Sequence, residues 1–227
     1  MNKNPKSSQN FLKKIHNHVR FIAFLCTIGV LFAGLAILIS FFPIPPLDIL
    51  ISQGIQQQGE DLAFFIMQAL SFFGEVPVAI VMIGGIFFWL YMSGNRKEAF
   101  FLFGTIIADI VNVGLKLLIN RPRPTDDLVT IAHVFTDTSF PSGHTVHYTV
   151  FFGYLIVIMF FIKNIPTLIR ILVTIISVIL IGGISVSRIY LGAHWASDTV
   201  GGYLVGILFL SSIIYWYLQM REKRYRI

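Results

Sequence analysis

The sequence predicts an all-α membrane protein, a bundle of six transmembrane helices with both termini in the cytoplasm. Composition is the first observation: 56% of the residues are hydrophobic, only 12% are charged, and the mean hydropathy is +0.77. A soluble domain carries about a quarter charged residues, so most of this surface is expected to face lipid. The second observation is a series of uncharged or weakly charged runs near the length of about 20 residues that crosses a bilayer as a helix.

Each long apolar run predicts one span. In order, the predicted spans are Phe21 to Phe42, Val76 to Ser93, Ala99 to Ile119, Thr145 to Ile162, Ile169 to Val186 and Val200 to Leu218. The run from Leu62 to Phe73 is too short to span and predicts an interfacial or re-entrant helix. The segments around Pro43 to Asp61 and Thr125 to Ser139 are expected to be loops.

The distribution of positive charge predicts the topology. Of the 17 lysine and arginine residues, all but Lys116, Arg121, Arg123 and Arg188 fall near the two termini or in the loops after the second and fourth spans. The positive-inside rule places these regions in the cytoplasm. The chain therefore divides into a basic cytoplasmic segment (1–20), a six-span domain (21–218) and a basic cytoplasmic tail (219–227). The net charge of +6 is explained by these basic ends, so no nucleic-acid partner is expected.

Three short clusters lie at the outer ends of predicted spans, and two of them contain the four exceptional cations. The clusters are Lys116 to Pro124, Phe140 to His144, and Ser187 to Asp198. Alternating spans bring all three to one membrane face, the extracytoplasmic one. Cations placed there against the charge rule indicate a function.

The residue types predict a phosphoryl-transfer site. Lys116, Arg123 and Arg188 supply fixed positive charge for a phosphoryl group. Ser142 and Gly143 open a helix, whose free N–H groups favour an anion. These residues are the predicted phosphate-binding set.

Two histidines and one carboxylate complete the predicted site. His194 and Asp198 are four residues apart, and so would share one face of a helix. Asp198 can then hold the imidazole in the tautomer that leaves the other nitrogen free to attack phosphorus. His144, on another helix, can protonate the leaving alkoxide.

The three clusters resemble the signatures of the type 2 phosphatidic acid phosphatase superfamily. They read Lys-x6-Arg-Pro, Pro-Ser-Gly-His and Ser-Arg-x5-His-x3-Asp, and every signature position is present in order. The resemblance implies a helical fold, metal-independent hydrolysis without a cofactor through a phosphohistidine, and a phosphorylated membrane lipid as partner. Small six-span members act on phosphatidylglycerophosphate, phosphatidic acid or undecaprenyl pyrophosphate. The sequence does not indicate the lipid or the oligomeric state.

Several polar residues near the clusters are given other roles. His147, one helical turn beyond His144, is expected to pack or to support the site, and Asp109 to join an interhelical hydrogen-bond network. Arg121 is expected to gather anionic substrate or to contact lipid headgroups. The acids of the following loop, Asp126, Asp127 and Asp137, are expected to be solvated.

Two other functions fit parts of the pattern. A lipid phosphotransferase would use the same site with a second lipid as acceptor. A non-catalytic transporter or scaffold would need Asp109 and could dispense with the histidines. A vanadium haloperoxidase would share the anion pocket, but the predicted spans disfavour that class.

Overall fold

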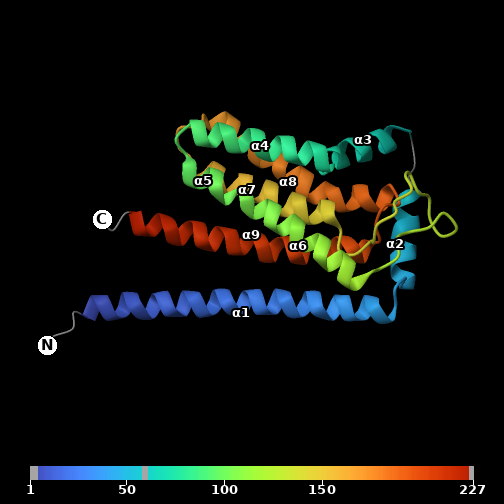
Figure 1. Ribbon diagram of the computed structural model, residues 1–227, viewed down its shortest axis with the longest axis horizontal. Helices are drawn as coiled ribbons and strands as arrows, with labels where there is room; N and C mark the ends of the chain where they lie inside the picture. The colour runs from blue at the N-terminus through green and yellow to red at the C-terminus, as the bar shows by residue number, and fades with distance from the viewer. Residues whose placement is uncertain (1–4, 58–60, 225–227) are drawn as a thin grey trace.

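The computed structural model describes residues 5–57 and 61–224, which form helices and loops without a strand (Figure 1). The helices are α1 (Pro5–Phe41), α2 (Pro46–Gln56), α3 (Asp61–Phe72), α4 (Val76–Met92), α5 (Arg96–Phe101), α6 (Phe103–Ile119), α7 (Gly143–Phe161), α8 (Thr167–Tyr190) and α9 (Ala196–Arg224). The all-α expectation is confirmed for this part of the chain. The first residues, 1–4, and the last, 225–227, of the two predicted basic segments lie outside it.

Five stretches among the described residues are long and apolar enough to cross a membrane. They are His16–Phe41 in α1, Arg96–Ile119 in α5 and α6, Gly143–Phe161 in α7, Thr167–Tyr190 in α8 and Ala196–Arg221 in α9. These match five of the predicted spans. The predicted second span, α4, reaches this standard only together with α3, across a bend of 51°. The short predicted helix and the second span are therefore the two arms of one broken helix pair.

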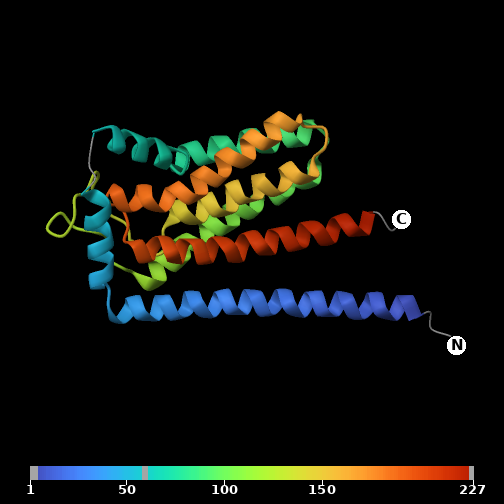
Figure 2. The ribbon, with the colours of Figure 1, turned by 180° about the vertical axis from the view of Figure 1, so that it is seen from behind.

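Helix α2 replaces part of the expected loop after the first span. Pro46 occupies its first turn and Pro45 precedes it with extended backbone (φ −64°, ψ 142°). A proline suits a helix start because the first N–H groups have no partner within the helix. The helix lies across one end of the bundle, steeply inclined to the long helices (Figures 1 and 2).

The core is built around α7, which packs against α8 and α9. Two glycines of α9 allow this contact to be close. A Cβ at Gly202 would lie 2.8 Å from the carbonyl oxygen of Ser142, and one at Gly206 would lie 2.6 Å from Cβ of Thr149. Small residues let membrane helices approach each other in this way. The start of α9 is thereby held against the start of α7.

Both ends of the described chain lie at one end of the bundle, where α1 begins and α9 finishes (Figures 1 and 2). Helix α2, the long loop between α6 and α7, and the turn between α8 and α9 lie at the other end. The three sequence clusters belong to that second end, so the convergence expected from counting spans is present in the fold.

Candidate active site

The three clusters meet in one cavity of about 690 Å³. Its polar end is lined by six of the predicted site residues, namely Lys116, Arg123, Gly143, His144, Arg188 and His194. The other two, Ser142 and Asp198, are fully buried behind this lining.

His194 lies in the tight turn that joins α8 to α9, with only 2% of its surface exposed. Gly192 makes this turn possible: its φ is +63°, and a Cβ there would lie 2.1 Å from the carbonyl oxygen of Thr130. Only glycine fits such a position. Beyond it, the N–H groups of Ala193 and His194 both donate to the carbonyl of Arg188, at 3.0 and 3.2 Å. The turn fixes the imidazole between Arg188 and the start of α9.

The imidazole of His194 is neutral at rest. Burial lowers its pKa well below the ordinary value, and the positive charges of Arg123 and Arg188 lower that pKa further. Nδ1 is 3.4 Å from Oδ2 of Asp198, and Nε2 is 3.4 Å from Nη1 of Arg123. A carboxylate only accepts, so Nδ1 carries the hydrogen. Nε2 therefore holds the lone pair, on the side of the cavity where the cations lie.

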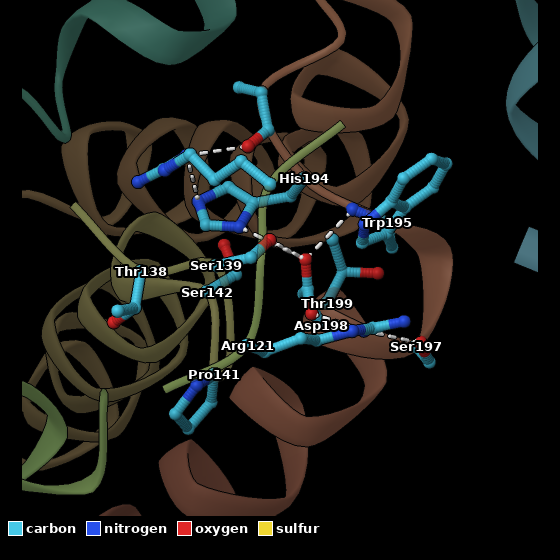
Figure 3. Close-up of polar contacts among 12 residues, drawn as sticks. Arg121, Thr138, Ser139, Pro141, Ser142, His194, Trp195, Ser197, Asp198 and Thr199 are labelled. Atoms are coloured by element: carbon cyan, nitrogen blue, oxygen red, sulfur yellow. Dashed lines mark hydrogen bonds and ion pairs between the residues drawn. The ribbon is translucent and has the colours of Figure 1, made fainter. Parts of the chain in front are cut away.

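Asp198 is the centre of a dense set of hydrogen bonds (Figure 3). Its Oδ2 accepts from the hydroxyl of Ser139 and from the N–H of Trp195, the latter at 2.8 Å. The sequence reasoning placed His194 and Asp198 on one helix, and this is wrong, because α9 begins only at Ala196. The two side chains still come close together, because Asp198 lies in the first turn of α9 and its carboxylate accepts from the backbone N–H of Trp195, just before the helix.

Arg121 is buried in the structure, and its expected role at the surface is wrong. Only 2% of its surface is exposed, and it joins two carboxylates. Nη1 donates to Oδ1 of Asp198, Nη2 donates to Oδ2 of Asp48 at 2.7 Å, and Nε donates to the carbonyl of Pro43 at 2.8 Å. The left-handed backbone of Asn120 (φ 49°) ends α6 just before it. Arg121 thus ties the carboxylate beside His194 to helix α2.

Asp137 is exposed, as expected for a residue of a solvated loop, but it also pairs with two cations of the site. Its Oδ2 accepts from Nζ of Lys116 at 2.9 Å and its Oδ1 accepts from Nη2 of Arg123 at 2.7 Å. Burial raises the pKa of Asp137, but the hydrogen bond and charge of Lys116, together with Arg123, outweigh this and leave the pKa below its usual value. With 57% of its side chain exposed, Asp137 is a counterion that an incoming anion can displace.

Arg188 has a different environment from the other two cations. It is 3% exposed, and its Nη1 donates to the hydroxyl of Ser71 at 3.2 Å. The ring of Phe135 lies 4.4 Å from the guanidinium carbon of Arg123 and 5.5 Å from that of Arg188. Nε of Arg188 is buried and has no hydrogen-bond partner among the described residues. A buried donor of this kind is satisfied when an anion enters.

The start of α7 presents His144 to the same cavity. Ser142 is the N-cap, and its hydroxyl accepts from the N–H and the hydroxyl of Thr145 at 3.5 and 3.0 Å. That hydroxyl caps the helix, whereas Gly143 lines the cavity. Nε2 of His144 is 3.5 Å from Oε1 of Glu75, in the break between α3 and α4. The sequence predicts for Glu75 only a place at the border of the site, at the start of the second span, and Glu75 does line the cavity.

The remainder of the cavity is an apolar groove between α4 and α6. Ile80 of α4 and Ile110 of α6 line it and are each 65% exposed, so the groove opens sideways at the flank of the bundle. Asp109 also lines it and pairs with Nδ1 of His147 at 2.9 Å. The interhelical hydrogen bond expected of Asp109 is confirmed.

Residues 97–223 match the family model of the PAP2 superfamily. This range contains every residue of the three clusters and more than half of the chain, so the protein belongs to the PAP2 superfamily.

Known relatives agree with this assignment. The chain is 32% identical over 135 residues to phosphatidylglycerophosphatase B of Bacillus subtilis (strain 168), an alignment that covers 59% of this chain and 63% of that protein. Its fold is similar to the crystal structure described as the first transmembrane PAP2 type phosphatidylglycerolphosphate phosphatase from Bacillus subtilis. The TM-score is 0.72 and the identity 22%, over 86% of this chain and 96% of the other. Aquifex aeolicus LpxE gives a TM-score of 0.58 at 20% identity, over 75% and 96% of the chains. At these identities the structures support the fold alone.

Proposed function

We propose that the protein is a lipid phosphate phosphatase that works through a phosphohistidine without a metal ion. The observation that carries the proposal is the shape of one cavity: a cation cluster with two histidines stands at the head of an apolar groove that opens sideways. A phosphorylated lipid has the matching form, because its headgroup is anionic and its tail stays in the bilayer.

In the first step, Nε2 of His194 attacks phosphorus while the bond from phosphorus to the ester oxygen breaks. Lys116, Arg123 and Arg188 stabilise the charge on the phosphoryl oxygens, and His144 gives its proton to the leaving oxygen. The N–H at Nδ1 of His194 stays hydrogen-bonded to Asp198, which stabilises the positive charge that develops on the ring. The dephosphorylated lipid leaves along the groove.

In the second step, water attacks phosphorus and the bond from phosphorus to Nε2 breaks. His144, now neutral, takes a proton from the water. Inorganic phosphate is released, and both histidines return to their initial state.

The proposed substrates are phosphatidylglycerophosphate, phosphatidic acid and undecaprenyl pyrophosphate. The first has support from the name of the Bacillus subtilis relative. The site is proposed to face the extracytoplasmic side, with both termini in the cytoplasm, because the basic residues gather near the termini and obey the positive-inside rule there.

Phosphate release by the purified protein from a panel of lipid monophosphates and pyrophosphates tests the proposal, with and without a chelator. His194→Ala should reduce release by a factor of at least about 10³. His133→Ala is the matched control, because His133 lies on the exposed loop and should leave the rate unchanged. Near wild-type release by His194→Ala would show that the nucleophile is another group. Loss of wild-type activity with the chelator would exclude the metal-free mechanism.

A further inference from the structure

Asp109 is an ionisable group in the middle of a membrane-spanning helix, and the proposed hydrolysis does not use it. It lies on α6, seven residues before Lys116, which places it about 10 Å deeper along the helix. Its side chain is 36% exposed and lines the apolar part of the groove. A carboxylate at such a depth is costly unless it has a partner or a function.

His147 holds this carboxylate in place. Its Nδ1 is 2.9 Å from Oδ2 of Asp109, and its ring stacks on Phe151 at a centroid distance of 5.4 Å. Nε2 of His147 is buried, and no hydrogen-bond partner for it exists in the part of the chain that the structure describes. An apolar side chain would fill this position without leaving a buried polar atom unsatisfied, so packing alone does not account for a histidine there. The contact with Asp109 does account for it.

Only one oxygen of the Asp109 carboxylate contacts His147. Oδ2 faces His147, and among the described residues no hydrogen bond reaches Oδ1. Because a carboxylate only accepts, the matching ligand group is a donor such as a hydroxyl. His147 follows His144 by one helical turn on α7, so Asp109 lies one turn deeper than the proposed acid. If the ester oxygen of a bound lipid lies at His144, the next atoms of the lipid lie at the depth of Asp109 in the groove.

We propose that Asp109, positioned by His147, binds a free hydroxyl on the carbon next to the phosphate ester. Among the proposed substrates it would favour phosphatidylglycerophosphate, whose headgroup glycerol carries such a hydroxyl, over phosphatidic acid and undecaprenyl pyrophosphate, which lack it. This inference rests on the proposed phosphatase function, whose site it extends down the groove. A hydrogen bond to a charged acceptor should favour the hydroxyl-bearing substrate about tenfold over an analogue that lacks the group.

The test compares two substrates that differ by one hydroxyl. They are a 1-acylglycerol 3-phosphate and the 1-acylpropanediol 3-phosphate that lacks the 2-hydroxyl. The wild type should show a kcat/KM about tenfold higher for the first. Asp109→Leu should lose this preference, because its kcat/KM should fall for the hydroxyl-bearing substrate and stay unchanged for the other. Asp109→Asn should lose part of the preference. Ile107→Leu, an exposed neighbour on α6 outside the groove lining, is the control and should keep the wild-type ratio.

Two outcomes would overturn the inference. One is an equal loss for both substrates in Asp109→Leu, which means that the pair only holds α6 to α7. The other is a ratio of the two kcat/KM values that is the same in Asp109→Leu as in the wild type. If the wild type releases phosphate from no lipid, the proposed function has failed instead. Thermal stabilisation by the two dephosphorylated lipids, monoacylglycerol and acylpropanediol, then decides: stabilisation by the first that Asp109→Leu removes supports the site, and equal stabilisation overturns it.

Discussion

Arg121 and His194 contact different oxygens of the Asp198 carboxylate. The guanidinium donates to Oδ1 of Asp198, while Oδ2 of the same carboxylate is 3.4 Å from Nδ1 of His194. Arg121 also reaches Asp48 on α2, whose carboxylate accepts from the N–H of Ser197 at 2.9 Å. The carboxylate that orients the proposed nucleophile is therefore fixed by residues from three separate parts of the chain.

Arg121→Lys should destabilise the protein strongly although it keeps the charge. One ammonium cannot reproduce the planar donor set that serves both carboxylates, and a disrupted buried ion pair costs about 3–5 kcal/mol. The measurement is the denaturation midpoint in detergent together with the hydrolysis rate. Arg20→Lys, in an exposed turn of α1, is the control. A variant Arg121→Lys with wild-type stability and rate would contradict the bridging role.

Asp137→Asn should tighten the binding of inorganic phosphate or vanadate several-fold. In the resting structure Asp137 occupies the donors of Lys116 and Arg123, and its charge competes with that of an incoming anion. The inhibition constant of vanadate at low salt measures the effect. Asp126→Asn serves as the matched control, since that loop residue is exposed and forms no ion pair among the described residues. Weaker inhibition in Asp137→Asn would mean that Asp137 organises the cations instead of competing for them.

His194 should make the folded state less favourable as the pH falls. Its folded pKa lies well below the value of about 6.5 in an unfolded chain, so below that pH the unfolded chain binds the proton first. The stability is complete above pH 6.5 and declines as the pH falls toward the folded pKa. His194→Gln should therefore lose less Tm than the wild type between pH 7.5 and 5.5. The exposed His133→Gln should behave as the wild type does, and an identical loss in His194→Gln would refute the neutral buried imidazole.

Gly202→Ala should lower both stability and activity. Its Cβ would lie 2.8 Å from the Ser142 carbonyl oxygen and 2.8 Å from Cβ of Thr145, which forces α9 away from the start of α7. Overpacking of this kind costs about 1–3 kcal/mol. Gly114→Ala is the control, because a Cβ there has no atom of another described residue within 4 Å beyond the neighbouring backbone of its own helix. Tm and the hydrolysis rate are measured for both variants, and equal behaviour would show that the helix contact is more tolerant than its distances suggest.

The residues at the polar end of the cavity could be predicted from the sequence alone. Lys116, Arg123, His144, Arg188 and His194 could be brought together by counting spans, because alternate spans return the chain to the same membrane face. This argument needs only hydrophobic lengths and charge positions, which are local properties.

Contacts between distant segments were not predictable in this way. Arg121 and Arg123 are both arginines before a proline in one irregular segment, and no periodicity distinguishes the buried one from the one in the cavity. The partner Asp48 lies 73 residues away, on a helix that was expected to be a loop. Asp137 looked like any loop acid, because its contacts arise only when the loop folds back over α6.

The sideways opening of the groove determines which concentration the enzyme would respond to. A lipid that enters between α4 and α6 approaches by diffusion within the plane of the membrane, so occupancy of the cavity would follow its mole fraction among the surrounding lipids. Enlarging the membrane at a fixed amount of substrate would slow the reaction, although the amount per volume of the suspension would be unchanged. The rate would thus report on the composition of the bilayer rather than on the total supply of substrate.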